Sequence, residues 1–143
     1  MGLSITSRAK KCPYRLDRGY FGFTFLRCEI ALALFPEFGE KYKAYFMTRN
    51  EKEQKKLWDE ICSIGNPLIR EGKMKPGFVE FLVEDDSDAT LSVRYTTDLF
   101  EQIKDLEIDI KFGYQGQKDC ATFSDFKNLV KWCAENKRCL KWY

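Results

Sequence analysis

The sequence predicts an α+β fold, a single helix-rich domain with a small sheet in which strands near the two chain ends pair. Apolar residues recur at helical spacing in four segments, and β-favouring residues gather in Gly2–Thr6 and in Arg138–Tyr143. The chain has 143 residues, of which 44% are hydrophobic and 15% aromatic. A chain of this size buries one sizeable core, so residues 1–143 are expected to form one domain.

The first part of the chain reads as a strand, a basic loop and a buried helix. Gly2–Thr6 is the strand, and Ser7–Arg18 carries five cations against one carboxylate. Pro13 and the lack of an apolar period predict a loop there, either a solvated connector or a rim that attracts anions. Phe23–Phe35 is apolar on several faces, which predicts a buried helix, and Pro36 ends it.

The middle of the chain predicts a second helix followed by a strand. The helix begins near Asn50 or Glu51, and the sequence GNP at 65–67 breaks or bends it. Residues 71–77 then read as a loop. The segment 78–84, FVEFLVE, is rich in β-favouring residues and predicts a strand, although its alternation is imperfect.

The last part of the chain begins with an acidic loop at 84–88 and a predicted helix at 97–105. Residues 106–113 alternate at period two, which favours a strand, with a continued helix as the competing interpretation. Thr122 and Asp125 have the spacing of a capping box at the start of another helix. The tryptophans lie in apolar stripes and are expected in the core: Trp58, Trp132 and Trp142.

The composition excludes several kinds of site. Because the sequence has no histidine, Ser–His and Cys–His nucleophile pairs and histidine-containing metal sites are excluded. A net charge of +2 gives no reason to expect specific binding of nucleic acid. The six cysteines include no CxxC pair, and no apolar run reaches membrane-spanning length. We therefore expect free thiols, a cytoplasmic location, no membrane partner, and neither a metal nor another cofactor.

One candidate ligand site begins in the stretch GYFGF, before the helix at 23–35. Tyr20 or Phe23 could stack on a base, and Gly22 would let the backbone approach a ligand. The same residues also fit a turn with core packing. Arg27 is a cation in a segment built for burial, so it must reach water, pair with a carboxylate or bind an anionic ligand.

The acidic loop supplies the other half of this candidate site. Asp85 and Asp86 could bind ribose hydroxyls or neutralise Arg27, and a solvated turn is the simpler alternative. The residues after Asp88 lack the later ligands of an EF-hand, so no calcium motif is present.

Four stretches carry a resemblance: MGLSI, YFGFTFLR, FVEFLVEDDSDATL and DFKNLVKW. Together they are similar to a family of small phage and prophage proteins of mostly unassigned function, and the match is spread over nearly the whole chain. Phe21 stands where that family has a glycine, Leu26 stands where it has a tryptophan, and the acidic loop lacks the family's Gly and Cys. The resemblance implies a phage origin and, by analogy, a factor that counters bacterial immunity.

The resulting functional hypothesis is a non-enzymatic protein of the host bacterial cytoplasm that sequesters a small anionic, nucleotide-derived immune signal. The alternative is an interaction protein that inhibits a host defence enzyme through an aromatic surface. A carboxylate-based nucleotide hydrolase is the third choice. A homo-oligomer is compatible with each of these, and the sequence identifies neither the ligand nor the target.

Overall fold

The computed structural model describes residues 3–7, 10–18, 22–112 and 121–143. Within them it contains six helices and four strands. In chain order these are β1 (Leu3–Ser7), β2 (Leu16–Arg18), α1 (Gly22–Leu34), α2 (Pro36–Met47), α3 (Glu51–Arg70), α4 (Pro76–Val83), β3 (Ala89–Leu91), α5 (Val93–Ile103), α6 (Phe123–Glu135) and β4 (Leu140–Trp142). None of the described helices is long and apolar enough to cross a membrane.

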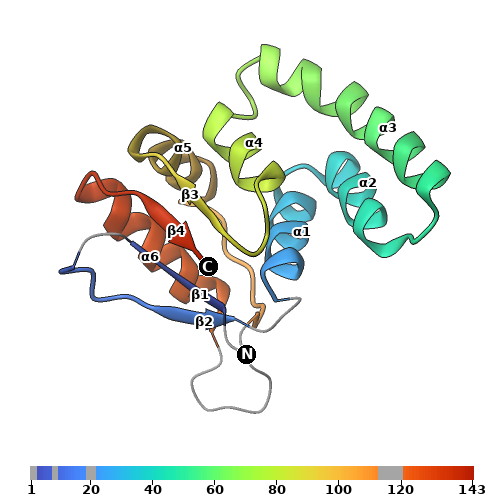
Figure 1. The fold of residues 1–143 in the computed structure, drawn as a ribbon. Coiled ribbons are helices and arrows are strands. Elements are labelled where there is room, and N and C mark those ends of the chain that lie inside the picture. Colours follow the sequence, from blue (N-terminus) through green and yellow to red (C-terminus); the bar gives the residue numbers. More distant parts are fainter. Residues whose placement is uncertain (1–2, 8–9, 19–21, 113–120) are drawn as a thin grey trace.

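The strands form one antiparallel sheet in the order β2-β1-β4-β3, so the strands nearest the two chain ends lie side by side at its centre (Figure 1). Ile5 of β1 pairs with Trp142 of β4, and Ser4 exchanges two backbone hydrogen bonds with Tyr143. The predicted α+β class and the predicted pairing of the terminal strands are confirmed. The short strands β2 and β3, at the two edges of the sheet, were not predicted.

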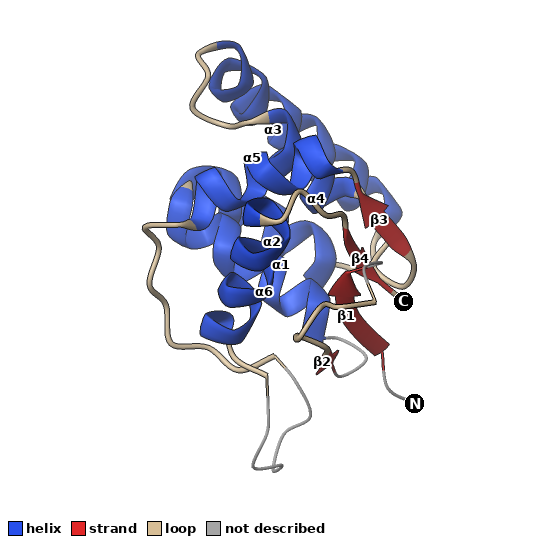
Figure 2. Ribbon diagram, turned by 90° about the vertical axis from the view of Figure 1, so that its left-hand side faces the viewer, coloured by secondary structure: helices blue, strands red, loops and turns tan. Residues whose placement is uncertain are grey.

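The helices pack against one side of the sheet, and α2 and α3 extend the molecule away from it (Figures 1 and 2). The core beneath the sheet is aromatic. Phe23 lies 4.8 Å from Trp142 and 5.7 Å from Phe81, and Phe81 lies 5.7 Å from Phe126, measured between ring centroids. All four side chains are fully buried, so helices α1, α4 and α6 meet the sheet through them.

The prediction of a strand at residues 78–84 is wrong, because this segment belongs to helix α4. Pro76 supplies the fixed φ that suits a first helical turn. Phe78, Phe81 and Leu82 then share one buried face at helical spacing. Gly77 lets α4 approach the backbone of Tyr95 in α5 so closely that a Cβ would collide. Tertiary packing therefore overrides the strand propensity of this short apolar run.

Other element boundaries also differ from expectation. Helix α3 continues through Pro67 instead of breaking there, and its N-cap is Asn50, whose side chain accepts hydrogen bonds from two backbone amides. Ser92 caps α5, which begins four residues before the predicted start at Thr97. Residues 106–112 form neither a regular strand nor a helix, with only an isolated bridge at Lys111. The capping box at the start of α6 is present as predicted.

Candidate functional site

Arg27, on α1, is only 2% exposed and binds the end of α4 through one nitrogen. Its Nη1 donates to the backbone carbonyl oxygens of Phe81 at 3.2 Å, Leu82 at 3.2 Å and Glu84 at 2.8 Å. The last carbonyls of a helix lack intrahelical donors and carry the negative end of its dipole. A guanidinium satisfies both requirements, so the helix end accounts for the buried cation.

Aromatic packing completes the surroundings of this guanidinium. Its carbon atom lies 4.9 Å from the centroid of the Phe23 ring, a cation–π distance. Among the described residues, Arg27 forms no ion pair with a carboxylate, and its buried Nε has no hydrogen-bond partner. Tyr42 reinforces the same helix end, because its buried hydroxyl donates to the Leu82 carbonyl at 2.7 Å.

The acidic loop folds back on itself and onto its neighbours. Asp85 Oδ1 accepts hydrogen bonds from the Ser87 hydroxyl at 2.6 Å and the Ser87 amide at 2.7 Å, which lowers the pKa of Asp85. The Trp142 indole donates to the Asp85 carbonyl oxygen at 2.7 Å. Thr24 donates to Asp86 at 3.3 Å. The loop is thereby joined to α1 and β4 while its three aspartate side chains remain exposed.

The structure brings together most of the residues named as a ligand site. Phe23, Arg27, Asp85 and Asp86 all lie around the end of α4, and Gly22 is the first residue of α1. Tyr20 lies outside the described residues. The Phe23 ring is enclosed by core aromatics, the Arg27 guanidinium by carbonyls, and the exposed groups of this surface are carboxylates. An anionic ligand here would meet negative charge before it reached the cation.

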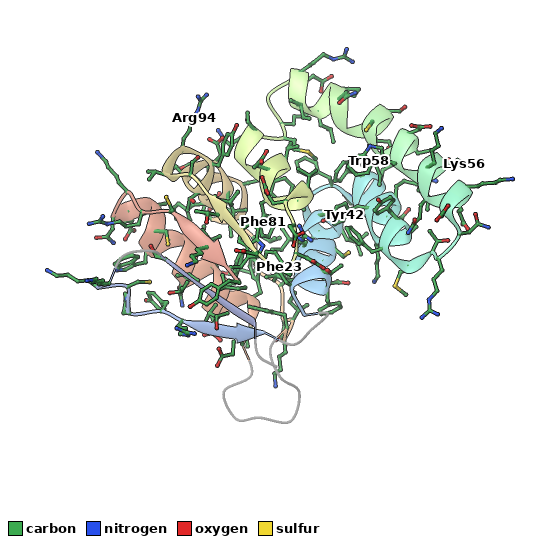
Figure 3. The ribbon with its side chains drawn as sticks, viewed as in Figure 1. Phe23, Tyr42, Lys56, Trp58, Phe81 and Arg94 are labelled. Carbon is green, nitrogen blue, oxygen red and sulfur yellow. The ribbon has the colours of Figure 1, made fainter. Side chains whose placement is uncertain are left out.

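A second feature is an apolar groove between α3 and α4, with α2 as its floor. Its volume is about 90 Å³. One wall is the α3 stripe that contains Trp58, Cys62 and Ile69, and the other contains Val79 and Val83 of α4. Figure 3 shows Trp58 lying on the side of α3 that faces α2, near Tyr42.

Most of the exposed large hydrophobic side chains belong to the three helices that form this groove, and three of them line it. Of the seven exposed large hydrophobic side chains among the described residues, five belong to α2, α3 or α4, and the other two are Phe25 and Tyr143. These five are Phe46, Met47, Trp58, Ile69 and Val83. The expectation that Trp58 lies in the core is therefore wrong, since the side chain is 40% exposed, whereas Trp142 is fully buried as expected.

Sequence reasoning missed the groove because it did not predict α2, which supplies its floor. Gly39, near the start of α2, lowers helix propensity, yet the packing of α1 on α2 requires it, because a Cβ there would collide with the backbone of Leu32. A usable signal was the width of the α3 pattern. Trp58, Cys62 and Ile69 form an apolar stripe next to the buried stripe of α3. A helix that packs on the core through one face needs only one apolar stripe, so the second indicates a further apolar surface.

Two carboxylates follow the groove-lining residues of α4 in the sequence: Glu80 comes after Val79, and Glu84, the C-cap of the helix, comes after Val83. Glu80 and Glu84 are hydrogen-bonded to each other, and this contact with a neighbouring acid raises the pKa of Glu80. Two adjacent carboxylates on the helix that supplies one groove wall favour a cation from a partner molecule.

The described residues contain no group of three or more cysteine or carboxylate side chains placed to hold a metal ion. Comparison with known proteins finds no matching family model, no similar curated protein and no similar solved structure.

Proposed function

We propose that this protein acts by binding another protein through the apolar groove between α3 and α4. The observation that carries the proposal is that three exposed large hydrophobic side chains, Trp58, Ile69 and Val83, line that groove. A contiguous exposed apolar patch rimmed by polar residues is typical of a protein interaction site. The function is binding, and no catalytic step is invoked.

The groove fits an amphipathic helix that carries a basic residue. From Trp58 to Ile69 the α3 wall extends about 16 Å, which corresponds to about three turns of a helix. An apolar side chain of the partner would enter the groove, whose volume is about 90 Å³, and others at helical spacing would pack on the exposed side chains of Trp58, Ile69 and Val83. A lysine or arginine beside them would meet the Glu80–Glu84 pair, which the protein leaves without a cation among its described residues.

A capture experiment with matched variants tests the proposal. Wild type, Trp58→Ala and Phe25→Ala would each be immobilised and exposed to bacterial extract, and retained proteins identified by mass spectrometry. Trp58 is 40% exposed in the groove and Phe25 is 42% exposed on α1. We expect a protein that is retained by wild type and Phe25→Ala but lost from Trp58→Ala. A retained set that is the same for all three proteins would contradict the groove as the binding surface.

The chemistry of the partner is tested in a second step. A peptide that covers the helix of the captured protein should bind wild type, and its affinity should fall when Glu80 is changed to Lys. An affinity that stays the same or rises would contradict the charge complementarity. The resemblance to phage proteins makes a bacterial defence protein the first class of partner to examine.

Sequestration of a nucleotide at Arg27 is the competing proposal. Its support is the placement of Phe23, Arg27, Asp85 and Asp86 around one helix end. A ligand phosphate would have to displace the carbonyl oxygens that Arg27 now binds. Melting temperatures of wild type with a panel of nucleotides separate the two proposals, because an increase that Arg27→Lys abolishes would favour sequestration at this site.

A further inference from the structure

The segment in which α6 leads into β4 lies at the opposite end of the molecule from α3 (Figure 1), and a basic recess is found there. Its volume is about 290 Å³, close to the lower end of the range of small-molecule sites. It is lined by Lys10, Lys11, Trp132, Asn136 and Arg138. We propose that this recess binds a small phosphate-bearing ligand with a planar ring, such as a mononucleotide, independently of the apolar groove.

The described residues of the protein do not neutralise the charge of the recess. Lys10, Lys11 and Arg138 are exposed and form no ion pair with any residue in the described part of the chain, whereas five other lysines do. Glu135, the acid nearest in sequence, lies 3.9 Å from Lys131 in an ion pair of its own. Three cations that have no ion-pair partner within residues 3–7, 10–18, 22–112 and 121–143 surround one recess, which favours a ligand with several negative charges.

Carbonyl groups near the end of α6, which could repel an anion, have backbone hydrogen-bond donors. Arg138 N donates to the Cys133 carbonyl oxygen at 2.8 Å, and Lys137 N donates to Ala134 at 3.3 Å. Together these bonds form the Schellman arrangement, in which the last carbonyls of a helix find backbone donors. The same turn, which continues past Asn136 and Lys137, places Arg138 in the lining of the recess.

Trp132 and Asn136 supply the neutral part of the recess. Trp132 is half-buried, so its indole is held by the core on one side and lines the recess on the other. The Asn136 side-chain amide donates to the Trp132 carbonyl oxygen at 2.8 Å, which fixes its orientation. An aromatic face among cations is suited to a base stacked on the ring with its phosphates on the lysines and the arginine.

Calorimetric titration with ATP, inorganic triphosphate and adenosine tests the assignment at low and moderate salt. We expect ATP to bind wild type more tightly than triphosphate or adenosine, and the affinity to fall as salt is raised. Arg138→Gln should weaken ATP binding about tenfold, because a charge-assisted contact is lost. Arg70→Gln, the same change at an exposed arginine on α3, should leave the affinity unchanged.

Two further variants separate ring recognition from charge attraction. Trp132→Leu should weaken the binding of ATP but not of triphosphate, and Trp58→Leu in the distant groove should change neither. Lys11→Gln should weaken both anions, whereas Lys56→Gln, at a lysine that projects from α3 into solvent in Figure 3, should weaken neither. A melting curve for each variant establishes that it is folded, and Trp132→Met, which also lacks a ring, replaces Trp132→Leu if the latter is not.

Several results would overturn the assignment. The first is no ATP binding at low salt, and the second is an equal loss of ATP affinity in Arg138→Gln and Arg70→Gln. The third is an ATP affinity that Trp132→Leu leaves unchanged, which would mean that the recess only attracts polyanions. Binding of a single-stranded oligonucleotide far more tightly than ATP would replace the small ligand with a nucleic acid. None of these measurements involves the protein that binds the apolar groove, so the ligand proposal and the groove proposal can be contradicted independently of each other.

Discussion

Nη1 of Arg27 lies 2.8 Å from the backbone carbonyl oxygen of Glu84, and this contact joins the first helix of the chain to the end of the fourth. The acceptor is the main chain and not the acidic side chain. An arginine in an apolar segment therefore has a structural explanation, because it supplies the donors that the end of α4 lacks. The same contact fixes the start of the acidic loop, whose next residue holds the Trp142 indole through its carbonyl.

Replacement of Arg27 should destabilise the fold. Arg27→Met preserves most of the side-chain volume but removes the donor shared by three carbonyls, and we expect a loss on the order of 3 kcal/mol in the free energy of unfolding. Arg27→Lys keeps the charge and should lose less. Urea denaturation measures both. Near wild-type stability for Arg27→Met would show that the helix end does not need the guanidinium.

Tyr42→Phe should cost about 1 kcal/mol, because it removes one buried hydrogen bond to the Leu82 carbonyl without changing the ring. Arg27 still donates to this carbonyl at 3.2 Å, so the acceptor is not left without a partner. Tyr45→Phe, at a half-buried tyrosine of the same helix, is the control for removal of a hydroxyl. Equal losses in the two variants, measured by urea denaturation, would contradict a specific role for the Tyr42 hydroxyl.

Stability should fall in alkaline solution from about pH 9 upward. Burial raises the pKa of the Cys28 thiol from 9.0 to about 11 and that of Cys133 to about 12, and burial also raises the pKa of Tyr42. Between the unfolded and folded pKa values the unfolded chain loses protons that the folded chain retains, so rising pH favours unfolding. The expected slope is about 1.4 kcal/mol per pH unit for each thiol.

Urea denaturation at several pH values between about 8 and 10 measures this slope, and Cys28→Ala supplies the control. Above about pH 9 the free energy of unfolding of the variant should fall less steeply with pH than that of wild type, and the difference in slope is the contribution of one thiol. This holds whatever the stability of the variant at pH 8. An unchanged slope would mean that Cys28 does not titrate differently in the folded and unfolded chains.

The thiols also test the expected reducing environment. Within the described residues Cys12, Cys28, Cys62, Cys133 and Cys139 are free. After anaerobic purification, all six cysteines of the chain should react with a thiol reagent under denaturing, non-reducing conditions. In the native protein the two buried thiols should react slowest, because their raised pKa values leave little thiolate. Two or more cysteines blocked as a disulfide would contradict this expectation.

The sequence predicted those parts of the fold whose signals are local. The capping box at Thr122 and the β-favouring chain ends carry their own patterns, and both appear in the structure. The segment 78–84 failed because a short apolar run has no decisive period. Its helical state depends on the approach of Gly77 to Tyr95, a contact between elements that no local pattern reveals.

For the candidate site, the sequence predicted which segments lie close together but not the contacts between them. The expectation that the acidic loop lies near Arg27 followed from charge, and the structure places the two together. The carbonyl acceptors could not be foreseen, because a strand at 78–84 would have used its carbonyls in a sheet. Only a helix that ends at Val83 leaves them free for a cation. The wrong prediction of a strand at 78–84 is therefore the reason that the carbonyl partners of Arg27 were not predicted.

Two helix ends in the chain allow a matched test of backbone strain. Helices α3 and α6 both end in a Schellman turn that contains one left-handed residue, Gly72 at φ 74° after α3 and Lys137 at φ 54° after α6. A side chain costs roughly 1–2 kcal/mol in this conformation, whereas glycine adopts it freely. The sequence therefore places the favoured residue at one turn and a strained one at the other.

Opposite substitutions should have opposite effects at these two positions. Gly72→Ala should lower the free energy of unfolding by about 1 kcal/mol, and the cause is the backbone alone, since nothing lies within 4 Å of the added Cβ. Lys137→Gly should raise it by up to about 1 kcal/mol, the relief of strain being partly offset by the greater freedom of glycine in the unfolded chain. Urea denaturation of both variants measures the difference. Destabilisation by Lys137→Gly would mean that the lysine contributes interactions worth more than the strain it imposes, and an unchanged Gly72→Ala would contradict the left-handed turn after α3.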